Sequence, residues 1–181
     1  MNRCKWVNLN NNLYVLYHDN EWGRPTRDDN LLFELLILEG FQAGLSWECI
    51  LNKRNSFKEA FSNFNSKEIA KYDENKINEL MNNKNIVRNR RKIEATIINA
   101  KVFLEIQKEY KTFANYIWSF TDNKVIKNMD DNFKTTSPLS DKISKDLKKR
   151  GMKFVGTTII YSYLQAIGVI NDHELNCFCY K

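Results

Sequence analysis

The sequence predicts an all-α fold. Apolar residues recur at helical spacing through most of the chain, capping side chains precede several of these segments, and no stretch alternates apolar and polar residues as a half-buried strand does. The 181 residues are 43% hydrophobic, which suffices for a buried core and excludes global disorder. We expect one unit of two closely packed helical lobes over residues 1–181.

The first predicted helices each follow a capping side chain. Asp28 or Asp29 can cap the first, Ser46 the second, and Ser66 and Asp73 the next two. The first helix is apolar almost all the way round, which indicates burial on most sides. These helices cover residues 30–40, 47–61, 67–72 and 74–83.

Periodicity indicates the later helices. One apolar stripe at i, i+4, i+7 and i+11 predicts a long helix, and it consists of Ile93, Ile97, Ala100 and Leu104. Further segments are a short helix at 113–117, a polar loop at 122–138, an amphipathic helix at 141–149 that Gly151 ends, and an apolar helix at 158–167 that ends near Gly168.

Composition also indicates the cellular location of the protein and the kinds of partner that it can bind. No run of about 18 apolar residues occurs, so we expect no membrane-spanning helix and no membrane partner. The first residues lack the apolar stretch of a signal peptide, and we expect a cytoplasmic protein whose four cysteines are thiols or metal ligands. The net charge of +6 permits a nucleic-acid partner, but a solvated lysine-rich surface explains it equally well.

Glu39 conflicts with its surroundings. Leu32, Leu35 and Leu36 form one stripe of the first predicted helix, and Glu39 continues that stripe. An ionised carboxylate among apolar neighbours is costly unless something pairs with it, which makes Glu39 a candidate for recognising or reacting with a ligand. The alternative is that the helix ends there and Glu39 meets water beside Gly40.

Aromatic residues gather in the same part of the chain. A connection with two glycines, residues 40–46, leads from Glu39 to the next helix, and glycine lets backbone bend or approach a ligand. Each aromatic residue alone is more typical of a core, but beside a carboxylate the set suits a flat heterocycle such as a flipped-out nucleobase. The set is Trp6, Tyr14, Tyr17, Trp22 and Trp47.

Each of the two histidines lies near a cysteine in the sequence. His18 follows Cys4 by fourteen positions, and His173 precedes Cys177 by four. Together they would form a closed tetrahedral zinc site, which is structural because no position stays open for water. Such a site would hold the terminal segments together. Unligated thiols and hydrogen-bonded histidines explain the pattern equally well, and Cys179 is an alternative ligand.

Two basic segments are candidates for contact with phosphates. In residues 84–91 an apolar turn, Asn85-Ile86-Val87, is followed by Arg88 and Arg91 at a helix start, where free amides and cations can bind phosphate. A solvated basic helix start is the ordinary alternative. Residues 148–158 form a second basic segment with two glycines, which lacks the spacing of a nucleotide phosphate loop.

Several blocks carry a resemblance to a known family. They are Arg3–Trp6, Tyr14–Gly23, Leu38–Trp47, residues 149–159 and Asn171–His173, and they span both ends of the chain. They resemble the 3-methyladenine DNA glycosylase I family. The resemblance implies a helix-hairpin-helix enzyme that removes 3-methyladenine from alkylated double-stranded DNA by hydrolysis. It also implies a structural Zn²⁺ on Cys4, His18, His173 and Cys177.

The resemblance further implies roles for the site residues. Glu39 would be the catalytic or recognition carboxylate, Tyr17 would hydrogen-bond the base, and Trp47 would stack on it. Tyr14, Trp6 and Trp22 would complete the wall. The hairpin at 84–91 would grip DNA and Gly44-Leu45 would act as a wedge, so the implied DNA-binding set is Gly44, Leu45, Asn85, Ile86, Val87, Arg88 and Arg91.

The chain departs from the family pattern at two hairpin positions, Asn85 and Arg91, where glycine is usual. Asparagine tolerates the left-handed conformation, so the turn is expected to survive. N3-methylation makes adenine a cationic leaving group, so Glu39 would recognise the base and stabilise its charge without protonating it. No lysine suggests a Schiff base, and we expect a monomeric enzyme without lyase activity that releases free 3-methyladenine.

Two other functions compete with this interpretation. A metal-dependent phosphohydrolase would use His18-Asp19, but two histidines are few for such a centre. A nucleic-acid-binding module without activity would account for the basic segments but leaves the carboxylate among aromatic residues unexplained.

Overall fold

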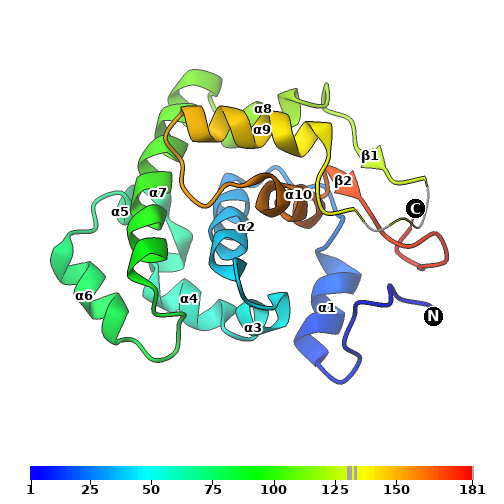
Figure 1. The fold of residues 1–181 in the computed structure, drawn as a ribbon, viewed down its shortest axis with the longest axis horizontal. Coiled ribbons are helices and arrows are strands. Elements are labelled where there is room, and N and C mark those ends of the chain that lie inside the picture. Colours follow the sequence, from blue (N-terminus) through cyan, green and yellow to red (C-terminus); the bar gives the residue numbers. More distant parts are fainter. Residues whose placement is uncertain (130–131, 133, 181) are drawn as a thin grey trace.

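The computed structural model describes residues 1–129, 132 and 134–180, and it is mostly helical (Figure 1). In chain order the elements are α1 (Asn12–Asn20), α2 (Asp29–Gln42), α3 (Trp47–Asn52), α4 (Arg54–Ala60), the 3-10 helix η1 (Ser62–Phe64), α5 (Ser66–Ile69), α6 (Glu74–Asn82), α7 (Arg90–Tyr110), α8 (Phe113–Ser119), β1 (Ile126–Lys127), α9 (Pro138–Lys149), α10 (Thr157–Ala166) and β2 (Ile170–Asn171). The prediction of a helical fold is confirmed except for β1 and β2, which pair in parallel. Strands of two residues are too short to show an alternating pattern.

Helix α2 lies at the centre of the molecule (Figure 1). Every residue from Leu32 to Phe41 is buried, and the helix packs against α3, α7, α8 and α10. The side chain of Asp28 accepts hydrogen bonds from the amides of residues 30 and 31, as predicted for an N-cap. The helix continues through Gly40 to Gln42, so the prediction that a connection begins at Gly40 is wrong. Packing on all sides outweighs the low helix propensity of one glycine.

Helix boundaries differ from the predictions where tertiary contacts decide them. The segment 47–61 is divided into α3 and α4 at Lys53, and Asn65 rather than Ser66 caps α5. Helix α9 begins at Pro138, three residues early, because Ser137 forms a reciprocal capping box with Ser140. Helix α1 was not predicted, since its apolar residues follow no single stripe.

Residues 83–89 connect α6 to α7. Ile86 is buried and anchors this turn, Lys53 Nζ donates to the carbonyl oxygen of Asn85 at 3.2 Å, and the side chain of Asn89 caps α7. Asn85 does not adopt positive φ. The tolerance of asparagine for the left-handed conformation is therefore not what preserves the turn.

The two terminal segments lie side by side (Figure 1). The amide of Phe178 donates to the carbonyl oxygen of Asn2 at 3.0 Å, and the amide of Lys5 donates to Glu174 Oε1 at 2.8 Å. Across the described residues, no helix is both long enough and apolar enough to cross a lipid bilayer.

Gly168 follows α10 with φ +71°, and a Cβ built on it would collide with the backbone of Arg24 and Pro25. We expect Gly168→Ala to lower the free energy of unfolding by about 3 kcal/mol or more, because both the backbone conformation and the contact are unfavourable. Gly156→Ala is the matched control, since a Cβ there meets nothing within 4 Å. Thermal denaturation measures both, and equal melting temperatures would contradict the packing at Gly168.

Candidate functional site

A cavity of about 510 Å³ opens beside the C-terminal half of α2. Glu39 lines it together with all five predicted aromatic residues, which are Trp6, Tyr14, Tyr17, Trp22 and Trp47. Its lining also includes polar residues that were not predicted from the sequence, among them Gln42, Thr158, Ser162, Gln165 and Asp172. Gln42 lies three positions after Glu39, so the helical periodicity that selected Glu39 could have found it too.

Glu39 is buried at this cavity. Its residue is 4% exposed, so the alternative in which it meets bulk water does not hold. Its Oε2 atom has no hydrogen-bond partner among the described residues, and burial raises the pKa of its carboxyl from 4.5 to about 8. A buried carboxyl oxygen that no protein group satisfies is available to a ligand.

Aromatic rings form the walls around Glu39. The ring centroids of Tyr17 and Trp47 lie 5.3 Å apart, and those of Trp6 and Trp22 lie 4.8 Å apart at an interplanar angle of 72°. The indole nitrogen of Trp47 is buried without a partner among the described residues. Burial, followed by the charge of Glu39, raises the pKa of Tyr17 well above 10, which keeps its hydroxyl neutral. The cavity thus offers flat apolar faces with a few polar groups, as a planar heterocycle requires.

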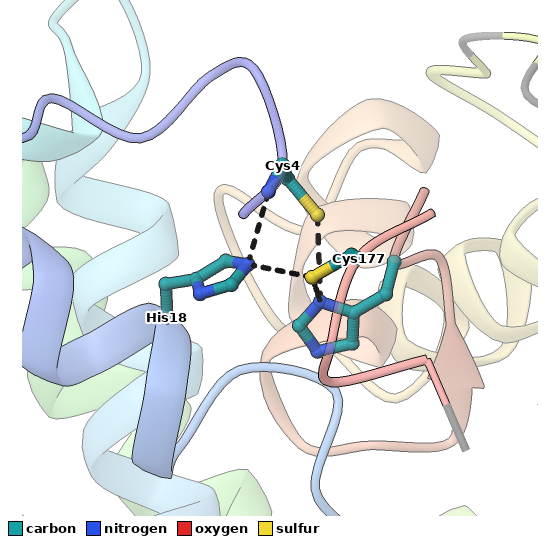
Figure 2. A group of neighbouring side chains, drawn as sticks. Cys4, His18 and Cys177 are labelled. Carbon is teal, nitrogen blue, oxygen red and sulfur yellow. Dashed lines mark hydrogen bonds between the residues drawn. The ribbon is translucent and has the colours of Figure 1, made fainter. Parts of the chain in front are cut away.

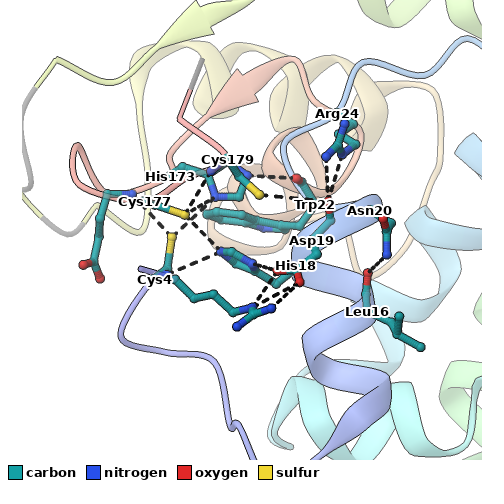
Figure 3. A network of polar contacts seen from close by, with 12 residues as sticks. Cys4, Leu16, His18, Asp19, Asn20, Trp22, Arg24, His173, Cys177 and Cys179 are labelled. Atoms are coloured by element: carbon teal, nitrogen blue, oxygen red, sulfur yellow. Dashed lines mark hydrogen bonds and ion pairs between the residues drawn. The ribbon is translucent and has the colours of Figure 1, made fainter. Parts of the chain in front are cut away.

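The four predicted metal ligands lie together in a buried cluster, the Cys/His cluster of Cys4, His18, His173 and Cys177. Figure 2 shows Cys4, His18 and Cys177, and Figure 3 adds His173. The Sγ atom of Cys4 is 3.4 Å from Nδ1 of His173, and Sγ of Cys177 is 3.5 Å from Nε2 of His18 and 3.6 Å from Nδ1 of His173. Tetrahedral zinc with the usual Zn–S and Zn–N distances places sulfur and nitrogen about 3.6 Å apart. The residues therefore fit a tetrahedral zinc ion.

The outer nitrogens of both histidines are also fixed (Figure 3). His18 Nδ1 donates to Asp19 Oδ1 at 2.7 Å, and Asp19 pairs in turn with Arg3 at 2.7 Å. His173 Nε2 donates to the carbonyl oxygen of Trp22 at 3.1 Å. Such bonds orient the inner nitrogens toward a metal. Burial lowers the pKa of His18, and it lowers the pKa of His173 to about 4. Both shifts favour the neutral imidazole, which is the form that binds a metal.

Cys179 lies beside the cluster rather than within it. Its Sγ is 3.9 Å from the carbonyl oxygen of Asp19, and it groups with His18 and Asp19 (Figure 3). The structure thus places Cys177, not Cys179, with the other three residues.

The cluster and the cavity share residues. The rings of Trp22 and His173 are 4.6 Å apart, those of Trp6 and His18 are 5.3 Å apart, and His173 itself lines the cavity. The position of the two tryptophans in the wall therefore depends on the cluster.

The predicted DNA-contacting residues lie on two exposed connections. Gly44 adopts φ +82° and Leu45 is 42% exposed at the end of α2. Arg88 and Arg91 are exposed at the start of α7, where Val87 is half-buried. Ile86 is buried, so its side chain packs the turn and does not face solvent.

Comparison with known proteins agrees with this geometry. A family model described as methyladenine glycosylase matches residues 6–180. The chain belongs to the methyladenine glycosylase family. It is 43% identical to DNA-3-methyladenine glycosylase 1 of Escherichia coli (strain K12), over 99% of this chain and 97% of that protein. The resemblance inferred from the sequence is confirmed.

Solved structures agree with this assignment. A crystal structure of 3-methyladenine DNA glycosylase I has a TM-score of 0.96 at 44% identity and covers 99% of this chain and 100% of that one. A structure of the Staphylococcus aureus 3-methyladenine DNA glycosylase I, described as showing the structural basis of 3-methyladenine recognition, has a TM-score of 0.95 at 35% identity. It covers 100% of this chain and 97% of that one.

The burial of Glu39 predicts a pH-dependent cost in stability. The pKa of the Glu39 carboxyl rises from 4.5 to about 8 on folding. Between pH 4.5 and pH 8 this carboxyl is therefore ionised in the unfolded chain but protonated in the folded protein. Its contribution to stability therefore falls as pH rises through this window. Glu39→Gln should match the wild type near pH 4.5 and exceed it at pH 8 by about 1 kcal/mol or more, or about 2–4 °C in melting temperature.

Thermal denaturation from pH 4.5 to 8 measures this difference. Glu59→Gln, at an exposed position, is the control and should not change with pH in this way. A constant difference between Glu39→Gln and the wild type over the whole range would contradict the buried carboxyl.

Proposed function

We propose that the protein hydrolyses the N-glycosidic bond of 3-methyladenine in alkylated double-stranded DNA and so begins base excision repair. The observation that carries this proposal is the buried, unpartnered carboxyl of Glu39 in an aromatic-walled cavity, in a chain that belongs to this family. Free 3-methyladenine is the released base. We further propose that it acts as a monomer in the cytoplasm.

Glu39 recognises the charged base and stabilises its charge. The flipped-out nucleotide carries a positive charge on its methylated ring, and a cation next to a buried carboxyl lowers the pKa of that carboxyl and favours its ionised form. When the bond to the sugar breaks, its electron pair moves to the base and neutralises it. Water adds to the sugar carbon and releases its proton to the solvent. The carboxylate therefore acts mainly before the bond breaks, by holding the charged base in the cavity and so raising the fraction of damaged nucleotides that are flipped out.

In this proposal the aromatic rings of the cavity bind the base, and the exposed connections at Gly44-Leu45 and residues 83–89 bind the DNA. Trp47 stacks on the base, Tyr17 hydrogen-bonds it, and Tyr14, Trp6 and Trp22 close the wall. Leu45, which follows Gly44 at φ +82°, occupies the gap that the base leaves. The lysines that line the cavity within the described residues, Lys5 and Lys134, are exposed. Neither has the desolvation that activates a Schiff-base lysine, so the enzyme has no lyase activity.

Two segments are candidates for the hairpin of a helix-hairpin-helix motif. One is the predicted segment at residues 83–89, with Arg88 and Arg91. The other is residues 150–156, where Gly151 adopts φ +101° and Gly156 is the N-cap residue of α10 and offers no side-chain cap. Uncapped amides at a helix start can bind phosphate, and α9 and α10, which flank the second segment, pack against each other as the two helices of such a motif do. We propose that both segments contact the DNA backbone.

Zn²⁺ is the ion proposed for the Cys/His cluster. Four protein ligands complete its coordination sphere, so it supplies stability and no nucleophile. Cys4 and His18 hold it from the N-terminal segment, and His173 and Cys177 hold it from the C-terminal segment.

Glu39→Ala and Glu39→Gln should reduce excision of 3-methyladenine about tenfold to hundredfold while leaving duplex binding unchanged, because the carboxylate acts on the flipped base. Chromatography of bases released from methylated duplex DNA under single-turnover conditions measures the rate. Glu59→Gln is the control. Unchanged rates in the Glu39 variants would remove this residue from the site, and no release by the wild type would favour the binding module.

Cys177→Ala should lose the metal and lower the free energy of unfolding by about 3 kcal/mol or more, because the terminal segments lose their link. Atomic emission should find about one zinc per wild-type chain and much less in this variant. Cys49→Ala, outside the cluster, is the control. Unaltered zinc content would overturn the ligand assignment, and metal removal that abolished activity without loss of stability would favour a metal-dependent phosphohydrolase.

A further inference from the structure

Lys92 is a buried lysine in the first turn of α7, 7% exposed, that the proposed chemistry does not use. Its Nζ atom donates to the carbonyl oxygens of Phe41 at 2.8 Å and Ala43 at 2.6 Å. These carbonyls lie at the C-terminal end of α2, where the helix dipole is negative and backbone oxygens lack intrahelical partners. The lysine thus acts as a cap on α2 that is supplied by another helix.

Burying this charge is unfavourable in itself. Desolvation lowers the pKa of Lys92, and no carboxylate among the described residues forms an ion pair with it. A methionine would fill similar space without that cost. The hydrogen bonds to the carbonyl oxygens of Phe41 and Ala43 are therefore the best explanation for a buried positive charge at Lys92.

Those carbonyls belong to the residues that present the site. Gln42 lies between them and lines the cavity, Glu39 is one helical turn earlier, and Gly44-Leu45 follows Ala43 directly. The hydrogen bond from Lys92 to the carbonyl oxygen of Ala43 therefore fixes the backbone position from which the proposed wedge, Gly44-Leu45, begins.

Lys92 also contacts both segments proposed to bind phosphates. The backbone amide of Lys92 donates to the side chain of Asn89 at 3.2 Å. Asn89 directly follows Arg88, and Lys92 directly follows Arg91. The Nζ atom of Lys92 lies 5.9 Å from the ring centroid of Phe154, in the segment 150–156. Phe154 lies next to Gly40 of α2, where a built Cβ would be 3.5 Å from Phe154 Cβ.

We propose that Lys92 is a positioning residue that holds the wedge at the end of α2 in fixed relation to the two phosphate-contacting segments. Binding of the DNA backbone then places Leu45 correctly for extruding the base. This inference rests on the proposed function and adds a residue that acts through Ala43 and Leu45 rather than on the base.

Lys92→Met keeps the length of the side chain and removes its donors. Its single-turnover excision from methylated duplex DNA should fall about tenfold or more, because small displacements at a site have large effects on rate. Excision from the same methylated strand without its complement should change less than about twofold, since no paired base has to be separated. Lys92→Arg, which keeps charged donors, should lose less than Lys92→Met.

A double-mutant cycle with Leu45 tests the route of the effect. Leu45→Ala should show the same selective loss on duplex DNA, and adding it to Lys92→Met should cost little more, because both act through the wedge. Lys101→Met, on the exposed face of the same helix, is the matched control and should excise like the wild type.

The outcomes separate this inference from the proposed function. If the wild type and Lys101→Met release no 3-methyladenine, the proposed function fails. If they release it and Lys92→Met equals them, or loses activity equally on duplex and single strand, the positioning role is wrong and Lys92 contributes only to stability.

Discussion

The central constraint on this molecule is a buried carboxyl group with one oxygen, Oε2 of Glu39, that no described residue satisfies. Glu39 lies in a helix whose neighbouring residues are all buried, and its free oxygen faces a cavity instead of a cation or a donor. Such a group is costly in the free protein, and the cost falls when a positively charged ring enters. The proposed recognition of a cationic base fits this arrangement, because a neutral base would gain little from the same carboxyl.

The surrounding structure encloses that carboxyl with aromatic rings. Trp6 and Trp22 form part of the wall, and both pack against histidines of the Cys/His cluster. The carbonyl oxygen of Trp22 also accepts a hydrogen bond from Nε2 of His173. A cluster that links the two ends of the chain thus packs directly against the wall of the cavity, which fits the structural role proposed for its metal.

The sequence contained much of the fold and most of the base cavity. Capping residues such as Asp28 and Asp73 act over three residues, and Glu39 interrupts an apolar stripe on its own helix, so both signals are local. Lys92 could not be found in this way. Its partners, Phe41 and Ala43, are about fifty positions away, and only the packing of α7 on α2 brings them together.

Titration of the Glu39 side chain by carbon-13 NMR tests the account most directly, with Glu39→Gln used to assign the resonance. The structure predicts a pKa of about 8 in the free protein, because burial disfavours the charge. The proposed recognition predicts a clear decrease when a cationic methylated adenine nucleoside is bound. A pKa near 4.5 in the free protein, or no decrease on binding, would contradict the account.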